Sequence, residues 1–486
     1  MSVDLTPAAL IDPLLTLSAT EAVAALRAGD HSSTELVRAV LHRIEVVNPS
    51  VNAIRATLAA EALAAAAEAD DRLRRGEPRG VLDGLPVTVK DNIDVAGSAT
   101  THGCAALAGA VATTDAPVVA NLRAAGAIPV ARTNMPDFAL RWHTDSGLLG
   151  ATVNPWDPTL TPGGSSGGEA VALATGMSLL GVGTDLGGSL RWPSQCAGTA
   201  ALRPTQGRVP DTPEQLKAPG LRLLDTHGPM ARRVEDLRLA FSVMAAPDPR
   251  DPWNAPVAAD YVPTVPRTVH VLRAMAGVEY DPAVRLGLER AAGALTDAGY
   301  RVLDDPPPGL GDRRAGETWA GLMAADARRV WPELGPLASA GGRRFMELMF
   351  GLVPPVDQAG YAELFVTRDR LARSWAVYQA RTPLVLAPVH AGAPFAAGAD
   401  LDGPAAADRI VDSLRATLVV NLLGLPSVAV PAGLHDGLPV GVQVIGPRFG
   451  DELCLRAAAV IEEVIGAATG NGLARITPIE PVAART

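Results

Sequence analysis

Residues 1–75 are expected to form helices, because their apolar positions recur at intervals of three and four residues. One face of an expected helix carries Leu36, Val40, Ile44 and Val47. The segments "SATE" (18–21) and "SSTE" (32–35) each fit a capping box, with Ser at the cap and Glu three residues on, and so predict two helix starts. Pro49 is expected to stop the second helix, and the alanine-rich segment 56–75 to form a third.

From residue 85 onward, short apolar runs typical of strands alternate with stretches typical of helices. The expected strands are "LPVTV" (85–89), "AIPVART" (127–133), "SLLGVGTD" (178–185), "RVL" (301–303), "PLVLAPV" (383–389), "PSVAVPAG" (426–433) and "VGVQVIG" (440–446). The expected helices are 116–125, 169–177 and 284–298. This alternation favours an α/β fold in which a mostly parallel sheet is covered by helices.

A long helical stretch interrupts the alternation at residues 310–380. It concentrates aromatic residues in a chain that is only 4% aromatic, which makes it a candidate cap facing a substrate. An ordinary helical layer over the sheet is the alternative. No repeat or low-complexity linker divides the sequence, so residues 1–486 are expected to form a single domain.

Charge and cysteine content exclude several classes of protein. A formal net charge of −10 argues against a nucleic-acid partner, which would call for a basic face. Cys104, Cys196 and Cys454 lie far apart, with no zinc-type spacing, and their odd number fits a reducing compartment. The N-terminus lacks a signal-peptide pattern, and the longest apolar stretches, 170–183 and 416–434, are broken by Gly, Pro and polar residues. We therefore expect a cytoplasmic protein without a membrane span.

The basic residues carry a chemical signal. Of the 42 lysines and arginines, only Lys90 and Lys217 are lysine, and Lys90 directly follows the expected strand 85–89. Arginine stays protonated under biological conditions, whereas burial lowers the pKa of a lysine by several units. Lys90 is therefore a candidate neutral base, a role that arginine cannot take. A lysine that escaped replacement by chance is the alternative.

A glycine-serine loop, "TPGGSSGG" at 161–168, leads into the helix expected at 169–177. A phosphate loop would need a lysine before Ser or Thr, but Glu169 follows this loop. The string "GGSSG" also matches a nucleophile elbow, although the preceding "NPWDPTLTP" (154–162) is too rich in proline for a central strand. An ordinary flexible loop remains a third interpretation.

A second glycine turn follows the strand expected at 178–185. In "GTDLGGSLRWP" (183–193), Ser189 lies 24 residues after Ser165 of the first loop. Glycines allow consecutive backbone N–H groups to point into one cavity, and such a group of donors stabilises an oxyanion. The chain thus combines a candidate neutral lysine, a loop serine and a serine at a candidate oxyanion turn.

These motifs together resemble the amidase signature family. "GGSSGG" followed by the serine of "GTDLGGSLR" is similar to the family's serine-rich signature, and Lys90 in "VTVKDNID" looks like its catalytic lysine, 75 residues before Ser165. The likeness runs from about residue 20 to residue 465. Other stretches that agree are "RTNMPDF" (132–138), "GATVNPWDP" (150–158), "LRPTQGRV" (202–209), "HGPMARRVED" (227–236) and "GLPVGVQVIG" (437–446).

The resemblance implies an α/β fold with a large mixed β-sheet, helices on both faces and additional N-terminal helices. It also implies a Ser–cis-Ser–Lys mechanism without metal or cofactor. Ser189 would be the nucleophile, and Ser165, after a cis bond from Gly164, would bridge Ser189 to Lys90. The N–H groups expected to hold the oxyanion are those of Leu186, Gly187, Gly188 and Ser189.

Further residues take supporting roles by the same resemblance. Ser166 is expected to join the serine network, and Asp185 and Arg191 to orient the loops; a purely structural ion pair is the alternative for these two. The segment that lines the acyl pocket in family members corresponds here to Ala139, Leu140 and Trp142. With Trp192, these residues suggest an apolar, aromatic pocket, and core packing is the alternative for the tryptophans.

The resemblance implies hydrolysis of a carbon–nitrogen bond in a small-molecule amide, aryl amide or carbamate (urethane). One alternative is a glutamine-dependent amidotransferase subunit that needs a partner, although such members usually keep a DEF-type acidic stretch where this chain has "MPDFALRW" (135–142). Others are an aryl ester or carbamate hydrolase with secondary amide cleavage, and a non-catalytic binding protein. The complete Lys–Ser–Ser set argues against the last. We expect a free-standing monomer or homodimer.

Overall fold

The computed structural model describes residues 11–212, 218–310 and 313–468. Within these residues an 11-stranded sheet forms the centre of the molecule, and two short strands, β4 (Asp145–Ser146) and β5 (Gly150–Ala151), pair beside it. The strand order across the sheet is β1 (Ile54–Thr57), β3 (Ile128–Thr133), β2 (Pro86–Lys90), β6 (Leu180–Thr184), β8 (His227–Ala231), β7 (Ala200–Arg203), β12 (Ser427–His435), β13 (Leu438–Ile445), β11 (Leu384–Pro388), β9 (Thr268–Val271) and β10 (Arg301–Leu303).

The sheet is mixed, as the family resemblance implies, so the mostly parallel sheet favoured by the alternation is wrong. Strands β3, β2 and β6 are parallel, as are β11, β9 and β10, whereas all pairs from β6 to β11 are antiparallel. One cause is a hairpin between β12 and β13. Its two-residue turn, Asp436–Gly437, has positive φ at both positions, which suits the twist of an antiparallel pair.

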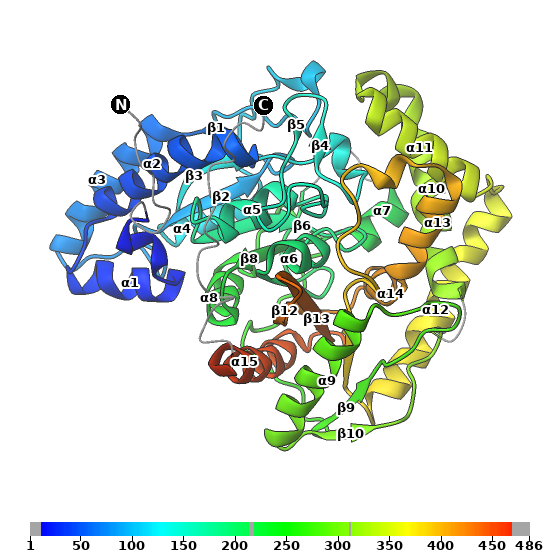
Figure 1. The fold of residues 1–486 in the computed structure, drawn as a ribbon. Coiled ribbons are helices and arrows are strands. Elements are labelled where there is room, and N and C mark those ends of the chain that lie inside the picture. Colours follow the sequence, from blue (N-terminus) through cyan, green and yellow to red (C-terminus); the bar gives the residue numbers. More distant parts are fainter. Residues whose placement is uncertain (1–10, 213–217, 311–312, 469–486) are drawn as a thin grey trace.

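Helices cover both faces of the sheet (Figure 1). Successive residues of β13 show this, because a Cβ at Gly441 would touch Gln195 of α6, while a Cβ at Gly287 of α9 would touch Val440. Neighbouring residues of a strand point to opposite faces. Helix α5 (Gly167–Ala174) packs against α6 (Arg191–Ala197). Helix α9 (Pro282–Asp297) packs against α15 (Asp451–Ala468), which in turn packs against α8 (Val234–Met244). Helix α4 (Pro117–Ala124) contacts α8.

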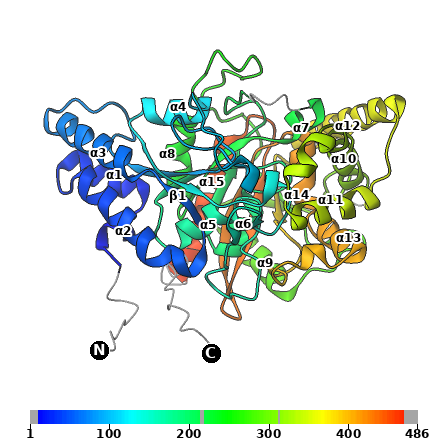
Figure 2. The same cartoon turned by 90° about the horizontal axis from the view of Figure 1, so that it is seen from above.

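The N-terminal helices lie at the β1 end of the sheet (Figures 1 and 2). Both predicted capping boxes are present, at the starts of α1 (Ala19–Ala28) and α2 (Ser33–Val51). Pro49 does not stop α2: the helix runs on to Val51, which is buried, and Asn52 caps it in a left-handed conformation. Residues 1–10 lie outside the described part of the chain. The alanine-rich segment forms both β1 and α3 (Ala59–Arg74), so its first residues are a strand and not a helix.

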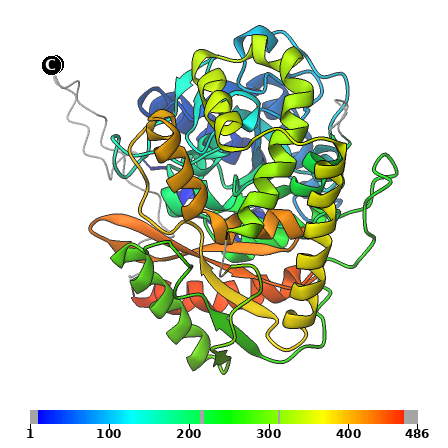
Figure 3. The same cartoon turned by 90° about the vertical axis from the view of Figure 1, so that its right-hand side faces the viewer.

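The stretch 310–380 is mainly helical, as predicted, apart from residues 311–312, which lie outside the described part. Its helices are α10 (Arg314–Leu334), α11 (Ala340–Leu352) and α12 (Gln358–Gln379). They gather with α7 (Pro219–Leu224), α13 (Pro404–Ser413) and α14 (Arg415–Leu423) on the side of the molecule opposite α1–α3 (Figures 2 and 3). None of the described helices is both long and apolar enough to cross a membrane.

Candidate active site

Two neighbouring parallel strands, β2 and β6, bring the first site residues together. Their register pairs Thr88 with Gly181, so Lys90 and Thr184 lie where both strands end, at the same edge of the sheet. Lys90 is fully buried, and its Nζ lies 2.7 Å from Ser165 Oγ and 2.8 Å from Thr184 Oγ1. The lysine and the first serine of the predicted set are therefore in direct contact.

The glycine-serine loop holds Ser165 against this strand edge. The peptide bond between Gly164 and Ser165 is cis, as the resemblance implies. A Cβ at Gly164 would lie 2.5 Å from the carbonyl oxygen of Arg141, so only glycine fits there without a shift of the backbone. The preceding residues form no strand, which removes the strand–turn–helix context that a nucleophile elbow needs. Ser166 is the N-cap residue of α5, and its N–H donates to the carbonyl of Ser189 at 3.2 Å.

The environment of Lys90 favours its neutral form. Burial lowers the pKa of Lys90 from its ordinary value to about 7, although the carboxylates of Asp225, Asp185 and Glu169 act in the opposite direction. A large fraction of Lys90 therefore lacks its proton near neutral pH. A neutral amine can accept a proton from the hydroxyl of Ser165, whereas an ammonium or a guanidinium cannot.

Glu169 is a buried partner that the sequence did not reveal as part of the site. Its carboxyl accepts hydrogen bonds from the hydroxyls of Thr88 and Thr133, the latter at 3.0 Å, and thus joins α5 to strands β2 and β3. Burial raises the pKa of Glu169 to about 7, against the lowering effect of both hydroxyls and of Lys90. The shifts of Glu169 and Lys90 both reduce the charge buried behind Ser165 at neutral pH.

The turn after β6 presents backbone N–H groups, but not the full predicted set. The N–H of Gly188 donates to Asp185 Oδ1 at 2.8 Å, so it points away from the position that the resemblance gives it. The N–H groups of Leu186, Gly187 and Ser189 donate to no acceptor among the described residues, and these three residues line the cavity described below. Three of the four predicted donors are thus free to hold an oxyanion.

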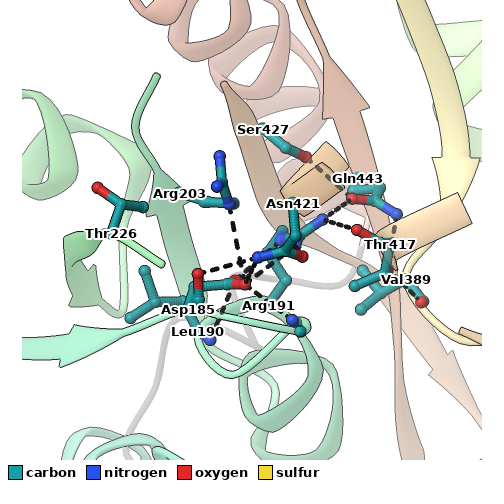
Figure 4. Close-up of polar contacts among 12 residues, drawn as sticks. Asp185, Leu190, Arg191, Arg203, Thr226, Val389, Thr417, Asn421, Ser427 and Gln443 are labelled. Atoms are coloured by element: carbon teal, nitrogen blue, oxygen red, sulfur yellow. Dashed lines mark hydrogen bonds and ion pairs between the residues drawn. The ribbon is translucent and has the colours of Figure 1, made fainter. Parts of the chain in front are cut away.

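Asp185 and Arg191 form a fully buried ion pair, with 3.0 Å between Arg191 Nε and Asp185 Oδ2. Arg191 also donates to Asn421 Oδ1 at 2.6 Å and Gln443 Oε1 at 2.8 Å, and Asn421 donates to Asp185 Oδ1 at 2.8 Å (Figure 4). Burial alone raises the pKa of Asp185, but Arg191, Arg203 and Asn421 lower it well below its usual range. The carboxylate is therefore charged and fixes the turn that carries Ser189.

A cavity of about 610 Å³ opens in front of both serines. One group of lining residues, which we call the sheet wall, consists of Ser165, Thr184, Leu186, Gly187 and Ser189. A second group of lining residues, the helix wall, consists of Trp319, Met323, Ala327 and Trp331 from α10 and Phe345 from α11. A substrate in this cavity could contact both polar groups and aromatic side chains.

Trp142, Ala139 and Leu140 line the cavity, but Trp192 does not. The ring of Trp192 has no exposed surface and packs against His390 and Phe395, at centroid distances of 4.5 and 5.6 Å. Its place in the pocket is therefore corrected: it supports the pocket from behind, donating from Nε1 to the carbonyl of Trp142 at 3.0 Å.

Sequence reasoning missed Thr184, Glu169 and Trp319. Thr184 belongs to the motif at 183–193, but nothing about a threonine at a strand end indicates contact with a lysine 94 residues away. Trp319 belongs to the stretch predicted as a cap, yet its contact with the turn is visible only in three dimensions. Among the described residues, no group of three or more His, Cys, Asp or Glu side chains could hold a metal ion.

Comparison with known families and structures identifies the chain's family. The family model described as "Amidase" matches residues 35–455, so the chain belongs to the amidase family. Indoleacetamide hydrolase of Bradyrhizobium diazoefficiens is 38% identical over 464 residues, which cover 93% of this chain and 87% of the relative. A glutamyl-tRNA(Gln) amidotransferase subunit of Chloroflexus aurantiacus is 35% identical over 469 residues, covering 90% of this chain and 95% of the relative.

A crystal structure of a bacterial aryl acylamidase of the amidase signature family shares the fold, with a TM-score of 0.83 and 25% identity. The match covers 97% of this chain and 100% of that chain. Together with the family match, these relatives identify the protein as an amide-cleaving hydrolase.

Proposed function

From its membership of the amidase family we propose that this protein hydrolyses a small amide with an aromatic acyl group, through an acyl-enzyme on Ser189. The hydrogen bond of 2.7 Å between Lys90 Nζ and Ser165 Oγ carries the proposal. It joins a fully buried lysine, whose pKa is lowered to about 7, to a serine on the wall of an aromatic cavity.

The proposed reaction begins with proton transfer along three residues. Neutral Lys90 takes the proton of Ser165 as Ser165 takes that of Ser189, and Ser189 Oγ attacks the amide carbonyl. The carbonyl oxygen becomes an oxyanion held by the N–H groups of Leu186, Gly187 and Ser189.

Collapse of this intermediate breaks the C–N bond. Ser165 returns a proton to the leaving nitrogen, which departs as ammonia or an amine and leaves an ester on Ser189. Water, deprotonated through the same relay, attacks the ester and releases the carboxylic acid. Ser189 then recovers its proton, so each residue ends as it began.

The helix wall supports an aromatic acyl group. Trp142 packs near both Trp319 and Phe345, with ring centroids 6.1 and 5.8 Å away, and all three residues line the cavity. Planar rings favour offset or edge-to-face contacts with such surfaces. The names of two similar proteins, indoleacetamide hydrolase and aryl acylamidase, agree with this choice. We therefore propose an arylacetamide, such as indole-3-acetamide, as the substrate class.

Glutamine is the second candidate substrate, because the amidotransferase subunit from Chloroflexus matches most of this chain. The α-carboxylate of glutamine needs a cationic partner. The cavity-lining guanidinium of Arg141 is already held by Asp400, with two contacts of 2.9 Å, and by Asp145 at 2.9 Å. This engagement, with the aromatic helix wall, favours the aromatic amide.

The first test is labelling with a serine-directed fluorophosphonate, followed by peptide mass spectrometry of the wild type and Lys90→Ala. We expect an adduct on Ser189 that is strongly reduced in the variant. An adduct on Ser165, or equal labelling of both proteins, would contradict the proposed relay.

Substrate class is tested by comparing kcat/KM for indole-3-acetamide, acetamide and glutamine with the isolated protein. We expect indole-3-acetamide to be preferred. Glutamine hydrolysis that appears only with a partner subunit would support the second candidate instead. Matched nitroanilide, nitrophenyl ester and aryl carbamate substrates then separate amide, ester and carbamate cleavage, which share the same oxyanion chemistry.

A further inference from the structure

Every carbonyl along the oxyanion turn accepts a hydrogen bond. Asp185 O accepts from Asn421 Nδ2 at 2.9 Å, and Gly188 O accepts from the backbone N–H of Trp192 at 2.7 Å. The two carbonyls between them accept from tryptophan side chains of the cavity. Leu186 O accepts from Trp319 Nε1 at 3.0 Å, and Gly187 O accepts from Trp142 Nε1 at 2.9 Å.

A hydrogen bond to a carbonyl also fixes the next N–H, because the peptide unit is planar and its C=O and N–H point in opposite directions. The bond from Trp319 to Leu186 O therefore sets the direction of the Gly187 N–H. The bond from Trp142 sets the direction of the Gly188 N–H, which is independently held by Asp185 Oδ1. The peptide plane between Leu186 and Gly187 is thus held by one hydrogen bond, whereas the plane between Gly187 and Gly188 is held by two.

We infer that Trp319 is a positioning residue for the oxyanion turn: its indole N–H aims the Gly187 N–H at the reacting carbonyl oxygen. This inference rests on the proposed function and deepens it. Trp142 has the same kind of contact with a smaller effect, because Asp185 holds the same plane from the other end. The residues that form the aromatic surface for the substrate therefore also set the geometry of the oxyanion donors.

The contact also explains a glycine at position 187. A Cβ there would lie 2.7 Å from Cζ2 of Trp319, closer than real Cβ contacts come. The φ angle of Gly187 is not positive, so alanine is compatible with the backbone and the indole is what excludes it. Gly187→Ala should therefore displace the indole of Trp319 without straining the turn itself.

The test compares Trp319→Phe with a matched control, Trp331→Phe. Both indoles lie on the helix wall, but Trp331 Nε1 donates to no acceptor among the described residues. Removal of one oxyanion donor costs about 10²–10³ in kcat, so mis-aiming one should cost about tenfold. We expect Trp319→Phe to lower kcat about tenfold, Trp142→Phe to lower it less, and Trp331→Phe, which alters only the aromatic surface, to change KM with the smallest loss of kcat.

The rate of Ser189 labelling by a fluorophosphonate is the second readout, because the phosphonyl oxygen also needs the oxyanion donors. It should fall with kcat in Trp319→Phe, while the pH dependence keeps its shape. Gly187→Ala should reproduce these losses with the tryptophan retained. Adding it to Trp319→Phe should cost little more, since the phenyl ring leaves room for the Cβ.

The outcomes separate this inference from the proposed function. A wild type that is not labelled on Ser189 removes the proposed function, and with it the inference. A wild type labelled on Ser189, with Trp319→Phe and Gly187→Ala reacting at the wild-type rate, overturns the inference and leaves the proposed function intact. Equal losses in Trp319→Phe and Trp331→Phe would also overturn it, because they would reflect the lost aromatic surface alone.

Discussion

The sheet wall and the helix wall of the cavity differ in the interactions that fix their side chains in place. Behind the sheet wall, buried polar groups contact one another, as Lys90 does with Ser165 and as Asp185 does with Arg191. The helix wall is built from large apolar side chains, such as Phe345 and Met323, that pack by surface contact. The first arrangement specifies directions of donors and acceptors, whereas the second specifies a shape.

This difference separates two properties of the enzyme. Changes behind the sheet wall should alter the rate of bond cleavage for every amide. Changes in the helix wall should alter which acyl group is accepted, because methylene-sized differences in an apolar pocket discriminate between substrates. Trp319 belongs to the helix wall but donates a hydrogen bond to Leu186 of the sheet wall. Its replacement should therefore change both the rate of bond cleavage and the choice of acyl group.

The largest expected effect is the loss of Lys90, the proposed base. Lys90→Arg keeps a positive charge but cannot release its proton, and Lys90→Met has no basic group. We expect both variants to lower kcat for every amide by about 10²–10⁴-fold, the usual contribution of general acid–base catalysis. Steady-state kinetics on indole-3-acetamide and acetamide measures this, and an active Lys90→Arg would show that the lysine is not the base.

Acid should reproduce this loss in the wild type. In the proposed relay Lys90 must be neutral, and its pKa of about 7 lies below the ordinary value, so protonation should remove activity as the pH falls through 7. We expect kcat/KM to decrease about tenfold per pH unit below 7, or about 100-fold at pH 5.

Glu169→Gln is the control for this profile, because Glu169 also has a pKa of about 7. The negative charge of Glu169 raises the pKa of Lys90, so its removal should lower that pKa. The fall of kcat/KM with acid should therefore begin at a lower pH. A limb that disappeared in Glu169→Gln would assign the titration to the carboxyl instead.

A smaller effect is expected when the turn loses its anchor. Asp185→Asn leaves Arg191 buried without its carboxylate, and breaking a buried ion pair costs roughly 3–5 kcal/mol of unfolding free energy. We expect kcat to fall about tenfold as well, because the Gly188 N–H loses a charged acceptor. Chemical denaturation and steady-state kinetics measure the two quantities.

Asp83→Asn provides the matched comparison. Asp83 is buried and pairs with Arg72 at 2.6 Å, next to α3 and away from the cavity-lining residues. It should lower stability without lowering kcat. If Asp185→Asn behaved in the same way, the ion pair with Arg191 would be a structural feature with no part in positioning the turn.

The smallest effect concerns substrate choice. Phe345→Leu shortens the helix wall beside Trp142, so the preference for indole-3-acetamide over acetamide should fall by up to about tenfold, with an unchanged rate of Ser189 labelling. Trp192→Phe changes an aromatic residue behind the cavity and should leave the preference unchanged. Equal shifts in both variants would contradict a specific role for the helix wall.

Residue type and spacing in the sequence single out one part of the candidate site. A lysine among arginines and two glycine-serine turns carry chemistry in their composition, so Lys90, Ser165 and Ser189 could be singled out from residue type and spacing. The strands β2 and β6 beside them could also be predicted from the sequence, because each is a short, fully buried segment in which apolar residues alternate with Thr or Gly.

The remaining parts depend on contacts between distant segments. Which way the Gly188 N–H points is decided by Asp185, and whether a tryptophan faces the cavity is decided by its neighbours. Trp192 and Trp142 therefore look alike in the sequence, although one is fully enclosed and the other lines the cavity. Contrary to the prediction from the sequence, Pro49 does not end its helix, for a similar reason. The helix continues because Val51 is buried and Asn52 caps it.

The most direct test of the account is the protonation state of Lys90. The chain has two lysines, so lysine labelled with ¹³C at Cε gives two NMR signals, and Lys217→Arg leaves the signal of Lys90 alone. We predict that this signal titrates with a pKa of about 7 in the folded protein. Titration at the ordinary lysine value, about 10.4, would show that Lys90 is charged at neutral pH and would contradict its role as the base.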